Sequence, residues 1–354
     1  MNNLKDPNIV VIGGGTGTST LLRGLKHKTE NLSAIVSVAD SGGSSGVLRD
    51  QFGILPPGDL LQATLALGNN EDLDKGFRVR DENHHTAGNR FLAKYWRKHG
   101  KSHKSIMGGI SLLGTVMGVA EGHKVIPASL NDITLTARDG DQIHHGEDKI
   151  GKIKFDDARK VDFSVERNGG GLFRQVIAHS MAVKAIKAAD VIVIAPGGLY
   201  YSLAPVLSIK GIQKALKKTN AKIIYVSNLM NNPGHTDGYA VQDCADEVER
   251  FADGKIIDTV IYNNQPPSQE AIKTYAHKGE TPVKLDDRTA HYEIVGADLL
   301  GEFNFKADPN DLIAEQRTAI RHDPPKTAQV VLNVAAGDYD SYDLIVRNGV
   351  GNAG

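Results

Sequence analysis

Short runs of Val and Ile recur along this 354-residue chain, and stretches with helical spacing flank most of them. The clearest runs are residues 9–12 (IVVI), 34–39 (AIVSVA), 190–196 (DVIVIAP), 222–228 (KIIYVSN) and 256–264 (IIDTVIYNN). Nearly continuous apolar runs are typical of strands buried on both faces, as in a parallel sheet between helix layers. The pattern therefore predicts an α/β fold with a mostly parallel sheet.

Two segments depart from this alternation. Residues 58–122 have helical spacing and no clear strand, so we expect a helical insertion there. Residues 125–155 alternate apolar and polar side chains around a turn at RDGD, which predicts a small β-meander or hairpin at the sheet edge. Helical patterns return at residues 309–322 and 326–337. We expect one domain over residues 1–325, followed by a C-terminal helix and tail over residues 326–354.

Composition limits the classes of partner. The formal net charge is -1, so no global field attracts nucleic acid or an anionic membrane. The chain has a single cysteine, Cys244, so it can form no internal disulfide, which fits a reducing compartment. Cys244 lies near a predicted helix start, which could lower the pKa of its thiol, but we favour an inert thiol. The first residues lack a signal-peptide layout, and no apolar run approaches the roughly 20 residues that span a bilayer. We expect a cytoplasmic protein, and the sequence leaves a homo-oligomer open.

The first predicted strand ends in a glycine-rich turn, residues 13–18 (GGGTGT). A dinucleotide fingerprint counted from Gly13 would place its third glycine at position 18, where Thr18 stands, and no Gly-Lys-Ser/Thr of a P-loop follows. Glycines with free N–H groups at a helix N-terminus nevertheless favour a bound anion. The alternative is a tight turn without a ligand.

Three further polar, glycine-rich loops follow predicted strands: residues 39–50, 195–205 and 227–239. Asp40 stands about where a ribose-binding acid would stand in a dinucleotide fold. An NAD(P) oxidoreductase therefore remains one alternative function. In an open parallel sheet, ligands bind outside the carboxyl ends of the strands. We expect the four loops to meet at one rim and to bind a ligand with phosphates and a sugar.

Metal and helix-capping signals are weaker. Asp59 precedes a helical stretch and is expected to cap it. No recognised metal motif surrounds the adjacent histidines at 84–85 or 144–145, so we favour no structural metal. A magnesium ion that Asp40 holds together with ligand phosphates is the alternative.

Read in order, five motifs resemble those of the gluconeogenesis-factor (YvcK-like, UPF0052) branch of the CofD superfamily. They are IGGGTGTSTLLRGLK, VADSGGSSGVLRDQFGILPPGD, HTAGN, AADVIVIAPGGLYYSLAPVL and SNLMNNPGHTDGY. The resemblance implies a Rossmann-like three-layer α/β/α fold. It also implies binding of a UDP-sugar, notably UDP-N-acetylglucosamine, and a role in envelope growth and cell shape on gluconeogenic carbon sources. The CofD branch supplies the alternative function, a magnesium-dependent transfer of a phospholactyl group from a nucleotide-activated donor to the deazaflavin Fo.

The matching positions are the expected ligand-binding residues, and Asp40 and Asp59 are the catalytic candidates if the protein is an enzyme. The ligand-binding set is Gly13, Gly14, Gly15, Thr16, Gly17, Thr18, Asp40, Gly42, Gly43, Ser44, Ser45, His85, Asn89, Gly197, Gly198, Ser202 and Asn228.

Several positions depart from the family pattern and leave the sugar and any catalysis open. Ser41 replaces the second acid of D-D-G-G-S-S-G, and Leu61 with Gln62 replaces a usual Arg-Asn pair. P-G-S-L-Y-T-S becomes PGGLYYS at residues 196–202, and His235 and Cys244 replace a Glu and a His. The chain thus resembles a divergent member.

Overall fold

The structure is a computed structural model that describes residues 6–168, 175–276, 279–302 and 320–345. Its centre is an eight-stranded sheet in the order β11-β10-β9-β8-β7-β1-β2-β3. All neighbours run parallel except β10 and β11. The strands are β1 (Ile9–Gly13), β2 (Leu32–Val36), β3 (Lys124–Pro127), β7 (Val191–Ile194), β8 (Lys222–Val226), β9 (Thr259–Asn263), β10 (Glu293–Ala297) and β11 (Asp343–Ile345). The predicted Rossmann-like α/β fold is confirmed.

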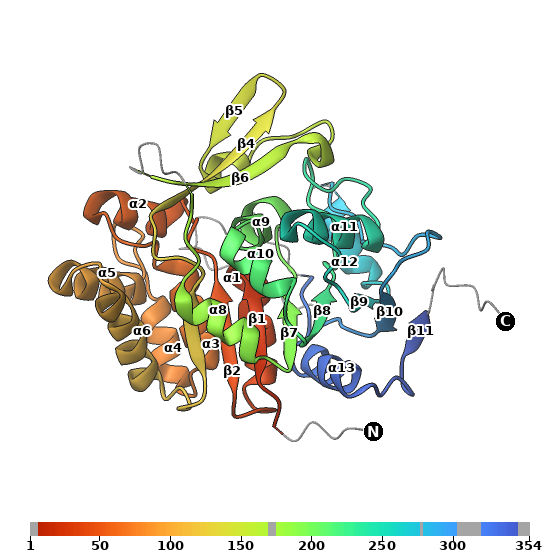
Figure 1. Cartoon of the computed structure of the whole chain (residues 1–354), viewed down its shortest axis with the longest axis horizontal. Coiled ribbons are helices and arrows are strands. Elements are labelled where there is room, and N and C mark those ends of the chain that lie inside the picture. Colours follow the sequence, from red (N-terminus) through yellow and green to blue (C-terminus); the bar gives the residue numbers. More distant parts are fainter. Residues whose placement is uncertain (1–5, 169–174, 277–278, 303–319, 346–354) are drawn as a thin grey trace.

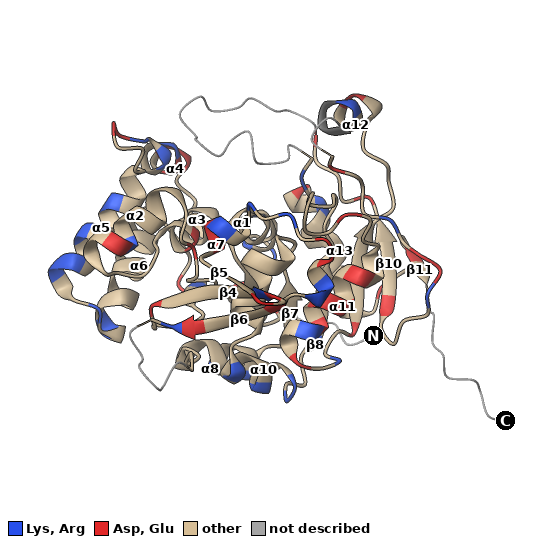
Figure 2. Cartoon of the chain, turned by 90° about the horizontal axis from the view of Figure 1, so that it is seen from above, with Lys and Arg blue, Asp and Glu red and all other residues tan. Residues whose placement is uncertain are grey.

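Helices cover both faces of this sheet (Figures 1 and 2). On one face, α1 (Gly15–Leu25) contacts α3 (Gly58–Leu67) and α13 (Pro324–Ala336). On the other, α8 (Ser180–Ala188) contacts α10 (Lys210–Leu216), which reaches α9 (Ala204–Leu207) and α11 (Val241–Ala252). A β-carbon at Gly24 would lie 2.1 Å from the Pro324 carbonyl oxygen, so only glycine lets α13 approach α1 this closely. The domain boundary at residue 325 stays a prediction.

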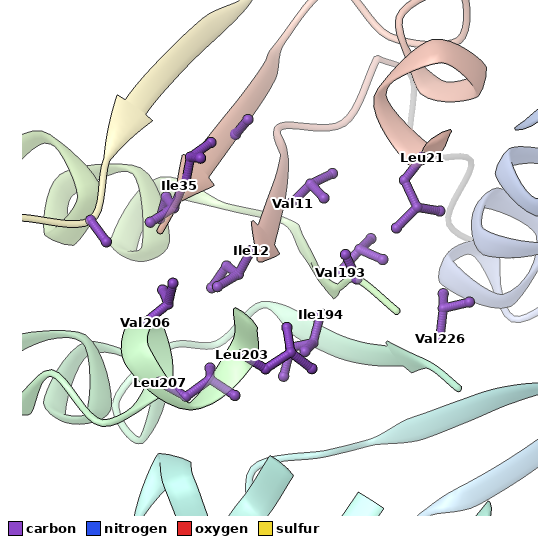
Figure 3. Close-up of a cluster of buried hydrophobic side chains, with 14 of the residues drawn as sticks. Val11, Ile12, Leu21, Ile35, Val193, Ile194, Leu203, Val206, Leu207 and Val226 are labelled. Carbon is purple, nitrogen blue, oxygen red and sulfur yellow. The ribbon is translucent and has the colours of Figure 1, made fainter. Parts of the chain in front are cut away.

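The hydrophobic core lies where β1 meets β7 (Figure 3). Val11 and Ile12 of β1 pair with Val193 and Ile194 of β7, and all four side chains are fully buried. Leu21 of α1 lies on the side of Val11 and Val193, because apolar residues recur on one face of that helix, and Leu203 and Val206 lie on the side of Ile12 and Ile194. This packing fixes the two strand ends from which the glycine-rich loops leave.

The predicted helical insertion lies between β2 and β3, and it begins earlier than expected. It consists of α2 (Gly43–Phe52), α3, α4 (Glu71–Arg78), α5 (Ala87–His99) and α6 (His103–Met117). Trp96 of α5 is buried, and its Nε1 donates to the Ile106 carbonyl at 3.2 Å, which ties α5 to α6. In the described part of the chain, no helix has the length and apolar character needed to cross a membrane.

The predicted β-meander is an antiparallel sheet of β4 (Ile133–Asp139), β5 (Gln142–His145) and β6 (Asp162–Arg167). It lies beyond the carboxyl ends of the central strands (Figure 1). The short helix α7 (Glu147–Ile150) follows β5 and the 3-10 turn at Ala158–Lys160 precedes β6. The first residues of the expected meander instead form β3, because they pair in parallel with β2.

Three other details differ from the sequence prediction. The second strand spans Leu32–Val36 rather than residues 34–39, because the chain leaves the sheet at Ser37. Strands β10 and β11 and the helix α12 (Gln269–Ala276) were not predicted. The helix expected over residues 309–322 lies almost wholly outside the described residues, whereas the one expected over 326–337 is α13.

Candidate functional site

The loops after β1, β2, β7 and β8 line one cleft of about 2160 Å³. It lies where the strand order turns from β1 toward β2 on one side and toward β7 on the other, the usual ligand position in such sheets. Pockets for drug-sized ligands enclose roughly 300–1,000 Å³, so this cleft is large enough for a ligand bigger than a typical drug molecule. Of the expected ligand-binding residues, Gly13 and Thr18 stand outside the lining; those that line it are Gly14, Gly15, Thr16, Gly17, Asp40, Gly42, Gly43, Ser44, Ser45, His85, Asn89, Gly197, Gly198, Ser202 and Asn228.

The first turn achieves close helix–strand packing through Gly17 rather than through position 18. A β-carbon at Gly17 would lie 1.9 Å from the Pro196 carbonyl oxygen, so this position requires glycine. Thr18 is buried, and its Oγ1 donates to the Gly14 carbonyl at 3.5 Å. The glycine of the dinucleotide fingerprint is therefore displaced by one residue, and Thr18 is compatible with the turn.

Asp59 does not cap its helix, contrary to expectation. Helix α3 begins at Gly58, and its N-cap residue, Pro57, makes no side-chain bond. The Asp59 carboxylate instead faces the first turn, where a β-carbon at Gly14 would lie 2.9 Å from Asp59 Oδ2. A carboxylate at this place repels a bound anion unless a cation lies between them.

Asp40 and Glu147 bring two partly buried carboxyl groups to the same wall of the cleft. Burial raises the pKa of Asp40, against the hydrogen bond that its Oδ1 accepts from the Gly42 amide at 2.9 Å. Burial also raises the pKa of Glu147 well above its usual range, and the carboxylates of Asp40, Asp59 and Asp148 add to the effect. The carboxyl groups on this wall therefore resist ionisation, and a cation or the hydrogen-bond donors of a ligand would stabilise their charged form.

Ser41, which replaces the family's second acid, forms hydrogen bonds with Asp148. Ser41 Oγ donates to Asp148 Oδ1 at 2.7 Å, and the Asp148 amide donates back to Ser41 Oγ at 3.0 Å. These bonds tie α7 to the loop after β2. The family's acid at position 41 would stand against Asp148, so the serine removes one like-charge contact from the wall.

Ser44, His85 and Asn89 form a hydrogen-bonded network in the cleft. Ser44 Oγ lies 2.9 Å from His85 Nδ1 and accepts from Asn89 Nδ2 at 3.0 Å. Asn89 is only 5% exposed, and within the described residues its Oδ1 has no hydrogen-bond partner. A buried polar atom without a hydrogen-bond partner lowers the free energy of unfolding by about 1–3 kcal/mol. Sequence reasoning placed these residues in the site but missed their contact, because 41 residues separate Ser44 from His85.

The loops after β7 and β8 are tied together by Asn228. Its Oδ1 accepts from the Gly197 amide and its Nδ2 donates to the Gly197 carbonyl, both at 2.9 Å. Asn228 therefore holds the two loops in place. The neighbouring Asn231 is buried and lines the cleft, and in the described structure its Oδ1 has no partner.

The two departures in PGGLYYS depend on each other. A β-carbon at Gly198 would lie 2.2 Å from the Tyr201 ring, so the larger side chain at 201 requires the smaller one at 198. Tyr201 Oη accepts from Asn232 Nδ2 at 2.9 Å. Burial raises the pKa of Tyr201 to about 12, with the carboxylates of Glu147 and Glu280 contributing. The ring adds an aromatic surface to the cleft.

The other departures replace polar groups by packed ones. Leu61 packs under Gly88, where a β-carbon would lie 2.4 Å from its Cδ1. His235 is buried with its Nε2 3.1 Å from the Ile150 carbonyl, and burial lowers its pKa. Cys244 is buried in α11, where burial raises its pKa, as the inert-thiol prediction requires.

Basic residues from α4, α5 and the segment between them form another wall: Arg78, Arg80, Arg90, Lys94, Arg97 and Lys98. Figure 2 shows Lys and Arg along α5. Arg78 pairs with Asp74, and Arg90 pairs with Asp81. Among the described residues, no three His, Cys, Asp or Glu side chains are grouped so that they could hold a metal ion.

Known proteins resemble the chain along almost its whole length. The family described as 2-phospho-L-lactate transferase CofD matches residues 9–300. The "Gluconeogenesis factor" of Halalkalibacterium halodurans is 33% identical over 341 residues, 93% of this chain and 97% of that protein. The "Gluconeogenesis factor" of Bacillus subtilis is 30% identical over 337 residues, 93% of this chain and 98% of that protein.

A solved structure agrees with the fold. The crystal structure of a UPF0052 family member from Bacillus halodurans has a TM-score of 0.78 and 32% identity, and the match covers 93% of this chain and 100% of that one. The fold, the motifs and the relatives lead to one conclusion: this chain belongs to the CofD family and is similar to its gluconeogenesis factors.

Proposed function

We propose that the protein binds a UDP-sugar, with UDP-N-acetylglucosamine as the first candidate, and acts as a cytoplasmic regulator of gluconeogenic growth and cell shape. The observation that carries this proposal is that two uncapped helix N-termini line one cleft. Helices α1 and α2 start at Gly15 and Gly43, and neither has a side-chain cap or an acid in its first turn. The first amides of a helix have no partner within it and favour an anion.

The rest of the cleft suits the other parts of such a ligand. The carboxyl groups of Asp40 and Glu147 accept hydrogen bonds from sugar hydroxyls and lie on the wall beside α2. The Tyr201 ring offers a surface on which a base can stack.

Isothermal titration calorimetry with UDP-N-acetylglucosamine tests the proposal, with and without magnesium because Asp59 lies beside the first turn. Thr16→Glu places a carboxylate in the first turn of α1 and should weaken binding at least about tenfold through like-charge contact. Thr115→Glu makes the same change on the exposed part of α6 and should leave affinity unchanged. Absence of heat at millimolar ligand, or equal affinity of both variants, would contradict the proposal.

A CofD-type transferase is the second candidate, because Asp40, Asp59, Glu147 and Asp148 line one cleft and the first, second and fourth of these carboxylates act electrostatically on Glu147. Magnesium usually takes one or two protein carboxylates together with substrate phosphates. These residues fit an ion that arrives with its nucleotide, and Asp40 and Asp59 would hold it, neutralising charge on the diphosphate. Magnesium-dependent product formation from Fo and a nucleotide-activated phospholactate, lost in Asp40→Asn, would establish this candidate.

A further inference from the structure

The hydroxyl of Ser44 lies within hydrogen-bond distance of a histidine ring nitrogen. Asn89 Nδ2 has only hydrogens to offer, so Ser44 Oγ is the acceptor in that 3.0 Å bond. The proton of Ser44 is then free to point at His85 Nδ1, 2.9 Å away, when the imidazole carries its own proton on Nε2. A hydroxyl within hydrogen-bond reach of an imidazole is the arrangement of an activated nucleophile.

Hydrogen bonds to the Asp81 carboxylate hold the segment that carries His85. The His85 and Asn83 amides both donate to Asp81 Oδ1, at 3.0 Å and 2.9 Å, and Arg90 pairs with the same carboxylate. Thr86 caps α5 by accepting from the Asn89 amide at 3.1 Å. His85 and Asn89 therefore keep their spacing without any contribution from Ser44.

The surroundings of Ser44 favour an anionic electrophile. Ser44 is the second residue of the ten-residue helix α2, whose first amides are unused within the helix. Gly43 has φ +46° and no atom within 4 Å of the place of a β-carbon, so the backbone there borders open space. Independently, Asn89 is more than nine-tenths buried and lines the cleft, and among the described residues its Oδ1 has no hydrogen-bond partner, so a polar atom beside Ser44 stays unsatisfied.

We propose that Ser44 is a nucleophile with His85 as its general base, and that the pair cleaves a phosphoanhydride bound in the cleft. His85 Nδ1 takes the Ser44 proton, Oγ bonds to phosphorus, and the bridging P–O bond breaks with its electron pair leaving on the departing phosphate, which receives the proton from His85. In the second half, His85 takes a proton from water, the water oxygen bonds to phosphorus, and the proton returns to Ser44 as the Oγ–P bond breaks. The identity of the substrate, a nucleotide sugar, rests on the proposed function; the nucleophile does not.

A fluorophosphonate probe tests the nucleophile without any assumption about the substrate. Ser44 Oγ should displace fluoride, so the full chain should gain one adduct by intact mass, which peptide mapping places on Ser44. Ser44→Ala should abolish the adduct, and His85→Gln should slow its formation about 100-fold or more. The matched control is His145→Gln, because Thr136 Oγ1 and His145 Nδ1 form a similar pair at 3.1 Å in the small sheet, outside the cleft lining. Melting curves establish that each variant is folded.

Phosphorus NMR with UDP-N-acetylglucosamine tests the reaction. UMP and the sugar 1-phosphate should appear with the wild type and not with Ser44→Ala. If calorimetry shows binding while no adduct and no cleavage occur, or if His85→Gln reacts as fast as the wild type, the nucleophile is overturned and the proposed function stands. If Ser44 is labelled while the nucleotide sugar does not bind, the nucleophile stands and the proposed ligand is wrong.

Discussion

Two glycines at the cleft show how single atoms constrain this site. Gly17 lies against the backbone of Pro196, and Gly198 lies against the ring of Tyr201. The first contact joins the turn after β1 to the loop after β7, and the second shapes the surface of the cleft. One glycine thus serves the fold and the other serves the site, and the two kinds of role call for different experiments.

Gly17→Ala should lower the free energy of unfolding by about 3 kcal/mol, because backbone overlap forces α1 away from the sheet. Chemical denaturation measures the change. Gly76→Ala is the matched control, since its β-carbon meets no atom within 4 Å in the exposed helix α4; it should raise stability by about 0.5–1 kcal/mol. Equal stability of Gly17→Ala and the wild type would show that the turn can shift without cost.

Gly198→Ser restores the family residue but should reduce both stability and UDP-sugar affinity, because the new side chain meets the Tyr201 ring. Adding Tyr201→Thr removes the ring, and the double variant should recover most of the stability. The coupling energy from the four proteins should be about 1–3 kcal/mol. Additive losses in thermal and calorimetric measurements would mean that the two departures are independent.

At the scale of elements, α7 joins two parts of the molecule. It belongs to the connection between the small-sheet strands β5 and β6, yet Glu147 and Asp148 line the cleft beside the loop after β2. Ser41 provides the hydrogen bonds that hold it there. The charge on α7 is therefore a property of the cleft, and it should respond to pH.

Glu147→Gln should stabilise the protein at pH 8 and have little effect near pH 4.5. The pKa of Glu147 in the folded protein is raised well above the ordinary 4.5 by burial and neighbouring carboxylates. Between the two values the folded state holds a proton that the unfolded state has lost, so wild-type stability falls as pH rises. The Tm of Glu147→Gln at pH 8 should exceed that of the wild type by a few degrees, about 2 °C for each kcal/mol of relief.

Glu121→Gln, at an exposed position, makes the same charge change and should follow the wild-type Tm at every pH. If the Tm of Glu147→Gln exceeded that of the wild type by the same amount from pH 4.5 to pH 8, ionisation of Glu147 would not be the cause of the difference.

Elements with strong local signals could be predicted, and those defined by distant partners could not. The Val/Ile runs of β1, β7, β8 and β9 are visible in the sequence because parallel central strands are apolar on both faces. Strand β10 follows a polar stretch, and β3 joins the sheet only by pairing with β2. In the cleft, glycines and loops were predictable, but the turn of Asp59 toward Gly14 and the Ser44–His85 contact arise from tertiary packing.

At the scale of the whole molecule, the cleft is built by segments far apart in the chain. Its lining runs from the turn after β1, through the helical insertion and α7, to the loops after β7 and β8 and on to His322. The unfolded chain contains no such surface. A ligand that contacts several of these segments therefore binds only the folded protein and must stabilise it as a whole.

UDP-N-acetylglucosamine at about 100 times its dissociation constant should raise the free energy of unfolding by about 2.7 kcal/mol, as linkage requires for a ligand of the folded state alone. Urea denaturation with and without the ligand measures the shift. At the same ligand concentration a tenfold weaker Thr16→Glu should show a shift of only about 1.4 kcal/mol, whereas Thr115→Glu should keep the full shift. A ligand that binds by calorimetry but leaves the urea midpoint unchanged would have to bind the unfolded chain equally well. That outcome would exclude the assembled cleft as its site, because the two helix N-termini line one cleft only in the folded protein.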